Sequence, residues 1–186
     1  MMTVNGWTLY AHPLLLEQLE AVTAAVERAR DKDPTGYAST ADARLLAAMR
    51  KLMFGVIPID PARPEFRQGG TLGASRKHWF RAKFGGGRFR LFFRYSSTAK
   101  IIIFSWVNDR DTLRTYGSKT DAYAVFKAML DKGTRPMIGR LWSRAALPLP
   151  RHDRERFHSV NRSTPDQIVA VSALISTKTK RAGLRK

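Results

Sequence analysis

Cationic side chains are concentrated in one stretch near the middle of this sequence, HWFRAKFGGGRFRLFFRY, from His78 to Tyr95. Basic and aromatic residues alternate there, and no Asp or Glu is present to neutralise the charge. Because successive side chains of a β-strand point to opposite faces, the basic residues of a hairpin here share one face. Like charges at such short distances repel one another, so a bound anion would stabilise this face. The residues concerned are Arg81 and Lys83 on one strand and Arg88, Arg90 and Arg94 on the next.

The opposite face of the same hairpin is predicted to be apolar, with Phe84, Phe89, Leu91 and Phe93 packed on helices. A simpler interpretation stays open, in which the basic face is only a solvated outer surface. The three consecutive glycines between the strands indicate a turn or a bulge rather than a phosphate cradle, because a strand and not a helix follows them.

A second group of candidate residues follows the third predicted strand, where Arg110, Arg114 and Tyr116 lie in NDRDTLRTYG. Arginine binds phosphate oxygens with two donors, and tyrosine can hydrogen-bond or stack on a base. We expect these residues to lie close to the basic face of the neighbouring strand. In the alternative interpretation, Tyr116 is a core residue and Arg110 pairs with Asp109 or Asp111.

The residues commonly used for acid–base or metal catalysis are not grouped in this sequence. Of the four histidines, only His78 is near the basic stretch, and no H-E-x-x-H motif, G-x-S-x-G motif or carboxylate cluster occurs. We therefore expect neither a metal nor another cofactor. RNA cleavage is still accessible, because the 2′-hydroxyl of the substrate can attack the adjacent phosphate while Arg and Lys stabilise the phosphorane. Lys83 and Tyr116 are each candidates for the base or the acid.

The chain of 186 residues is strongly basic, with 33 Lys and Arg against 15 Asp and Glu and a net charge of +18. Such a charge favours nucleic acid, an anionic membrane surface or an acidic protein as the partner. The sequence contains no cysteine, which excludes disulfides and thiolate chemistry. No signal peptide or membrane-spanning stretch is apparent. We expect a cytoplasmic protein without a membrane partner.

The spacing of apolar residues predicts an α+β fold in which helices cover one face of a small antiparallel sheet. Thr120 is expected to cap the last helix, which ends at Gly133. The predicted elements are a strand at 7–11, helices at 14–30 and 39–54, an extended connection at 57–66, strands at 78–84, 88–95 and 100–106, and a helix at 121–130.

Six segments, in chain order, read VNGWTLYAHP, KDP, FRQGGTLG, WFRAKFGGGRFRLFFRYS, VNDRDTLRTYG and KTDAYAVFKAML. They resemble segments of the YhaV toxins of bacterial type II toxin–antitoxin systems, within the RelE-like superfamily of messenger-RNA endonucleases. The resemblance runs from about Val4 to Gly133. It implies a RelE-like fold, with two N-terminal helices on one face of the sheet and a short C-terminal helix. It also implies cleavage of mRNA that inhibits translation and arrests growth.

The resemblance further implies partners. These are a cognate antitoxin resembling PrlF, mRNA with the ribosome as a further candidate, and operator DNA bound through the antitoxin complex. A homodimer is an additional expectation.

Roles for individual residues follow from the spacing of basic residues in RelE-like nucleases. By this resemblance, Arg90 and Arg110 would hold and neutralise the scissile phosphate. Arg81 and Lys83 would stabilise the transition state, and Tyr116 would orient the nucleophile or stack on a base. We expect further contacts to RNA from the other basic residues of the region: Arg76, Lys77, His78, Arg88, Arg94 and Arg114.

The chain divides at residue 133 into a RelE-like toxin domain, 1–133, and a basic tail, 134–186, with 12 basic and 3 acidic residues. YhaV-like proteins have a segment resembling G-x-P-P-x-D-W where this chain has GTRPMIGRLW. Reading the codons of Thr134 to Leu141 one nucleotide earlier permits Pro-Pro-Asp-Asp-Trp, so we hypothesise that the tail is translated from a shifted frame. The coding DNA tests this. The alternative is a genuine, poorly ordered tail that binds RNA.

A second class of function is a non-catalytic one, either a gyrase-poisoning member of the superfamily or a basic protein that coats RNA or operator DNA. Binding requires charge in number, whereas cleavage requires particular positions. Substitution of Arg90 separates the two classes.

Overall fold

The computed structural model of this chain describes residues 2–113, 115–131 and 147–148, and its fold is α+β, as predicted. A π-helical turn, Lys51–Val56, continues the second helix. The connection at 57–66, predicted to be extended, consists of turns and a short 3₁₀ helix, Pro64–Phe66. The predicted tail falls outside the described residues, except for a two-residue strand. The elements are β1 (Met2–Val4), β2 (Trp7–Ala11), α1 (Pro13–Lys32), α2 (Ala41–Arg50), β3 (Phe80–Phe84), β4 (Phe89–Ser96), β5 (Ile101–Val107), α3 (Ala122–Asp131) and β6 (Leu147–Pro148).

The sheet is mixed rather than wholly antiparallel, which corrects the prediction. Its strand order is β1-β2-β5-β4-β3, with β6 also paired to β2. The pairs β3–β4 and β4–β5 are antiparallel, whereas β2 runs parallel to β5, with Leu9 opposite Ile102. Tight connections make consecutive strands antiparallel, but the helical hairpin after β2 removes that constraint. The direction of β2 was therefore not fixed by its sequence neighbours.

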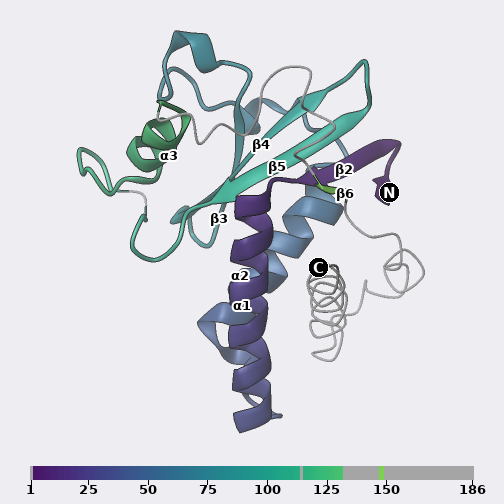
Figure 1. Cartoon of the computed structure of the whole chain (residues 1–186), viewed down its shortest axis with the longest axis vertical. Helices are drawn as coiled ribbons and strands as arrows, with labels where there is room; N and C mark the ends of the chain where they lie inside the picture. Colours follow the sequence, from purple (N-terminus) through teal and green to yellow (C-terminus); the bar gives the residue numbers. More distant parts are fainter. Residues whose placement is uncertain (1, 114, 132–146, 149–186) are drawn as a thin grey trace, which may run out of the picture.

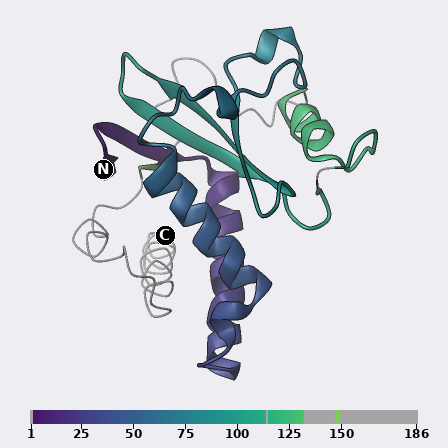
Figure 2. The same cartoon turned by 180° about the vertical axis from the view of Figure 1, so that it is seen from behind.

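Helices α1 and α2 pack on one face of the sheet and extend beyond it side by side (Figures 1 and 2). Pro13 occupies the first turn of α1, and Nδ1 of His12 accepts a hydrogen bond from the Leu14 amide at 3.2 Å. Thr40 caps α2 in the same way, since its hydroxyl oxygen accepts from the Ala43 amide. The core on this side includes Leu15, Leu19, Leu46, Met49, Leu91, Phe93, Ile102 and Phe104.

Helix α3 packs on the other face of the sheet, so the prediction that all helices share one face is wrong. Phe126 stacks on Phe92 with ring centroids 4.1 Å apart and on Trp106 at 5.6 Å. Phe92 and Trp106 point away from α1 and α2, because they alternate with Leu91 and Phe93 along the strands. Two aromatic rings on that face require a cover, and α3 supplies it.

The start of α3 also differs from the prediction, which placed the cap at Thr120. The carboxylate of Asp121 accepts a hydrogen bond from the Tyr123 amide at 3.0 Å, and the Asp121 carbonyl accepts from Val125. Asp121 therefore caps the helix. Among the described residues, no helix is both long and apolar enough to cross a membrane.

Candidate nucleic-acid interface

The β3–β4 hairpin places three of the predicted basic residues on one face of the sheet. Lys83 lies directly opposite Arg90, and Arg81 lies opposite Phe92. Directly paired residues of antiparallel strands point to the same side, so Arg81, Lys83 and Arg90 share the face that α3 covers in part. We call these three residues the basic cluster. Lys83 is exposed, whereas the two arginines are buried.

The glycine turn between the two strands shapes one end of the basic cluster. Gly85, Gly86 and Gly87 all have positive φ angles, which only glycine adopts at little cost. A Nη1 group of Arg90 donates to the carbonyl oxygens of Gly87 and Phe89, the latter at 3.0 Å. The turn thus holds the guanidinium of Arg90 back against the start of β4.

Arg81 and Arg90 both contact a residue that the sequence analysis did not select, Tyr123 of α3. Arg81 is 9% exposed, and its Nε donates to the Tyr123 hydroxyl at 2.8 Å while Nη1 donates to the Glu65 carbonyl. Arg90 is 5% exposed, and its guanidinium carbon lies 6.0 Å from the centre of the Tyr123 ring. One phenol therefore contacts both buried guanidinium groups.

The two buried arginines have no carboxylate partner among the described residues. Within the described part of the chain, ion pairs involve Arg63, Arg76 and Arg110, and none involves Arg81 or Arg90. The buried Nε of Arg90 has no hydrogen-bond partner among those residues either. Buried charges are normally paired, so an unneutralised pair at this position is the arrangement expected of an anion site.

Asn108 joins the basic cluster to the loop after β5 and was also missed by sequence reasoning. This fully buried side chain accepts a hydrogen bond from the Arg90 amide and donates to the carbonyls of Arg88 and Thr112, at 3.2 and 3.1 Å. Asp109 then closes the loop on itself, because its carboxylate accepts from the Thr112 amide and hydroxyl. The loop that carries Arg110 is therefore anchored to the start of β4.

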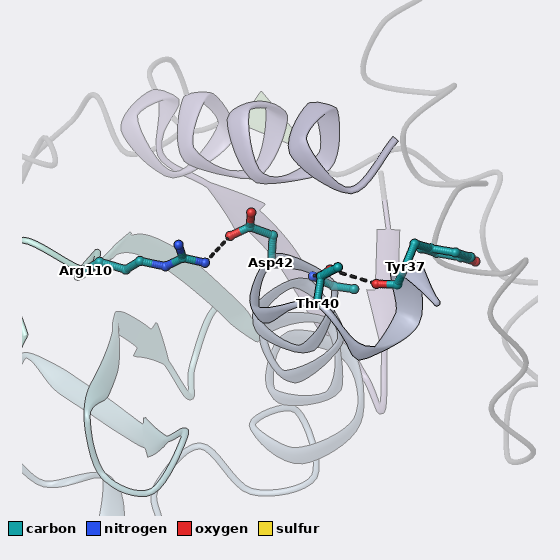
Figure 3. Close-up of polar contacts among 5 residues, drawn as sticks. Tyr37, Thr40, Asp42 and Arg110 are labelled. Carbon is teal, nitrogen blue, oxygen red and sulfur yellow. Dashed lines mark hydrogen bonds and ion pairs between the residues drawn. The ribbon is translucent and has the colours of Figure 1, made fainter. Parts of the chain in front are cut away.

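Arg110 points to α2 instead of completing the basic cluster. Its Nη2 lies 2.7 Å from the Asp42 carboxylate in an exposed ion pair, which Figure 3 shows beside Thr40. The alternative interpretation, a pair with Asp109 or Asp111, is wrong in its choice of acid. The same interpretation placed Tyr116 in the core, but Tyr116 is 85% exposed. Arg114 lies outside the described residues.

A second basic group lies further along the same strands, around Trp79. The guanidinium carbon of Arg94 is 5.4 Å from the Trp79 ring, and burial lowers the pKa of Arg94. Burial is also the largest cause that lowers the pKa of His78, and the charges of Arg94 and Arg76 lower it further. The guanidinium of Arg76 forms an ion pair with Asp131 at the end of α3.

The remaining predicted RNA contacts are exposed positions on the same hairpin region. Lys77 lies before β3 and Arg88 before β4, and both side chains are open to solvent. In the described residues, no three His, Asp or Glu side chains come together in a way that could hold a metal ion.

Sequence signals for the two missed residues were present but ambiguous. Tyr123 has the spacing of a core residue of α3, which it is, and nothing local indicates that Arg81 reaches its hydroxyl. Asn108 directly follows a buried strand, and a polar residue there often belongs to a loop. Their roles depend on contacts between segments that are distant in the sequence.

Comparisons with known proteins show the family to which the chain belongs. A family model described as a toxin with endonuclease activity, of a toxin–antitoxin system, matches residues 9–141. The chain is 52% identical over 134 residues to the ribonuclease toxin YhaV of Escherichia coli K12. The aligned region covers 72% of this chain and 87% of the relative. It is equally similar to toxin YhaV of E. coli O157:H7. No solved structure matches.

Proposed function

The chain belongs to the YhaV family of toxins with endonuclease activity, and on this premise we propose that the basic cluster is its ribonuclease site. The protein is a ribonuclease toxin of a toxin–antitoxin system, so its substrate is RNA and an antitoxin is its partner. The location of the site and the chemistry at it are our proposal. The observation that carries the proposal is the pair of buried arginines, Arg81 and Arg90, whose charge no acid of the described residues neutralises.

We assign the arginines to the charge that develops at the phosphorus. In cleavage by the 2′-hydroxyl, the 2′-oxygen bonds to phosphorus as the bond to the 5′-oxygen breaks, and a phosphorane with extra negative charge lies between the two states. Guanidinium groups fixed in advance stabilise such a charge without reorganisation. Arg81 is fixed by Tyr123 and Glu65, and Arg90 by the glycine turn. Neither side chain has to move to meet the transition state.

Two protons must also be transferred, one from the 2′-hydroxyl and one to the leaving 5′-oxygen. We assign these transfers to Lys83 and Tyr116, because both are exposed polar groups of the region. Lys83 lies opposite Arg90 on the hairpin, within the basic cluster. Tyr116 lies on the loop after β5, which Asn108 anchors to the start of β4.

The other basic residues are proposed to hold the RNA backbone. Arg88, Lys77 and the group around Trp79 extend the basic cluster along the hairpin, and exposed cations of this kind bind phosphates without reading sequence. Arg110 can join them once a phosphate replaces Asp42. His78 and Arg76 are assigned to the same path.

The finer identity of the partners is part of the proposal. We propose an antitoxin resembling PrlF that covers the basic cluster with an acidic segment, an arrangement favoured by the positive charge there. Cytoplasmic mRNA, bound to the ribosome or free, is the proposed substrate, operator DNA is reached through the antitoxin complex, and a homodimer is the proposed assembly.

Cleavage of a short RNA by the purified full chain tests the proposal. We expect Arg81→Gln and Arg90→Gln to reduce kcat by about 100-fold or more, in line with the loss of one oxyanion donor. Arg28→Gln on the exposed surface of α1 removes the same charge far from the site and should cleave normally. A 2′-deoxy nucleotide at the cut position should block cleavage and leave binding intact.

Three results would contradict the proposal. Equal cleavage by wild type and both site variants would show that the ribonuclease site lies elsewhere. Cleavage of the 2′-deoxy substrate would exclude attack by the 2′-hydroxyl. Binding without cleavage by every variant and by wild type would favour the non-catalytic class of function.

A further inference from the structure

We propose that Tyr123 is a positioning residue of the ribonuclease site, which orients Arg81 and Arg90 without neutralising them. This inference deepens the proposed function and rests on it. Tyr123 lies on α3, 42 positions after Arg81 in the sequence. Its role is visible only in the folded structure.

The contact with Arg81 fixes the plane of that guanidinium. Nε donates to the Tyr123 hydroxyl at 2.8 Å, and Nη1 donates to the Glu65 carbonyl on the opposite side of the group. A planar guanidinium held at two of its nitrogens has no freedom to rotate. In the described part of the chain, no hydrogen bond uses Nη2 of Arg81, so that nitrogen is available for a phosphate oxygen.

The contact with Arg90 is made through the ring of the same tyrosine. The guanidinium carbon lies 6.0 Å from the ring centre, a distance at which the ring attracts a cation. Arg90 is 5% exposed, and a charge so buried needs some compensation. The ring supplies part of it and carries no negative charge of its own. A carboxylate at this position would hold the arginines equally well but would cancel the charge that RNA needs.

Tyr123 is itself held firmly enough to act in this way. It is 6% exposed, and its ring packs edge-on against Phe92 with centroids 5.6 Å apart. Its amide donates to Oδ1 of Asp121 at 3.0 Å, while Oδ2 of the same carboxylate accepts from the Thr115 amide at 2.8 Å. The residue before Tyr116 and the start of α3 thus share one carboxylate. Tyr123 connects the basic cluster to the loop that carries Tyr116, one of the two residues proposed for proton transfer.

The test compares three variants of the full chain with wild type. Tyr123→Phe keeps the ring and removes the hydroxyl that accepts from Arg81. Tyr37→Phe is the matched control, because Tyr37 is also buried but lies at the α1–α2 hairpin, on the other side of the sheet. Arg90→Gln reports on the proposed function itself. Cleavage kinetics give kcat and KM separately, and nitrogen-15 NMR of the arginine Nε–H groups gives the exchange of the Arg81 proton with water.

We expect Tyr123→Phe to lower kcat by about 10- to 100-fold while KM changes by less than about threefold, because misplaced groups cost more in the transition state than in binding. Tyr37→Phe should keep the wild-type kcat. In wild type, the Arg81 Nε–H should exchange slowly with water, and Tyr123→Phe should remove this protection. A merely structural role would lower the kcat of both tyrosine variants alike.

The outcomes separate the inference from the proposed function. If Arg90→Gln is inactive but Tyr123→Phe cleaves like wild type, the positioning role is wrong and the ribonuclease site stands. If Arg90→Gln cleaves like wild type, the proposed site is wrong and the positioning role falls with it. Rapid exchange of the Arg81 Nε–H in wild type overturns the inference whether or not RNA is cleaved.

Discussion

Arg110 and Asp42 are 68 positions apart in the sequence, yet their side chains form an ion pair with a nitrogen–oxygen distance of 2.7 Å (Figure 3). The pair holds the loop after β5 against the start of α2. Its Arg110 side chain is 61% exposed, and exposed pairs of this kind contribute about 0–1 kcal/mol to stability. If Arg110 contacts RNA as proposed, a phosphate can replace Asp42 at low cost, and Asp42 then competes with RNA for Arg110.

Substitution of Asp42 tests this competition. We expect Asp42→Asn to strengthen RNA binding by about two- to fivefold, since releasing a surface pair is worth at most about 1 kcal/mol, with a change in unfolding free energy of the same small size. Binding titrations of a 2′-deoxy RNA analogue give the dissociation constant. Glu20→Gln, on an exposed position of α1, removes the same charge and controls for the general increase in positive charge. Equal strengthening by both variants would assign the effect to net charge alone.

Asn108 is expected to matter for both stability and cleavage. Its side chain makes three hydrogen bonds that join the start of β4 to the loop after β5. Asn108→Asp keeps the acceptor for the Arg90 amide but loses both donations and buries a charge. We expect it to lower the unfolding free energy by about 1–3 kcal/mol or more and to reduce kcat, because Arg90 and the loop lose their common anchor. Urea unfolding and cleavage assays measure the two effects, and an unchanged urea midpoint would contradict the anchoring role.

The glycine turn should tolerate no side chain at its first position. Gly85 has a φ of +58°, and a Cβ there would lie 2.7 Å from the Phe89 ring. We expect Gly85→Ala to lower the unfolding free energy by about 1–2 kcal/mol for the left-handed backbone alone. Gly70→Ala is the matched control, since a Cβ added at Gly70 would meet no atom within 4 Å and the residue has no positive φ. Urea unfolding of both variants measures the two losses of stability. Similar midpoints would mean that the turn accommodates the added methyl group and would contradict this prediction.

Local patterns predicted the elements of this fold well. The alternation on β3 and β4 placed Lys83 and Arg90 on one face, and the register of the hairpin agrees. The same alternation places Phe92 on that face, but the prediction did not consider this residue. An aromatic ring among the arginines indicates that the face is partly covered, and α3 covers it. Close reading of position 92 would have shown that the basic face is not fully open.

Other features depended on contacts that no local pattern contains. The parallel pairing of β2 with β5 follows from a crossover through two helices, and the partner of Arg110 is an acid on a distant helix. Tyr123 has ordinary core spacing, so its contact with Arg81 is set by how α3 docks. The assignment of the catalytic residues stays a prediction, because proximity of charges does not by itself establish cleavage.

The pH dependence of stability is expected to report on His78. Burial and the charges of Arg94 and Arg76 lower the pKa of His78 below its ordinary value of about 6.5, so the unfolded chain binds this proton more readily than the folded one. Stability from this residue is therefore fully present above about pH 6.5 and is lost as the pH falls through the lowered pKa. The neutral substitution His78→Gln should make the urea midpoint fall less between about pH 7 and about pH 5 than in wild type. An NMR titration of wild type gives the pKa directly, and a value at or above about 6.5 would contradict the lowering by burial and by the charges of Arg94 and Arg76.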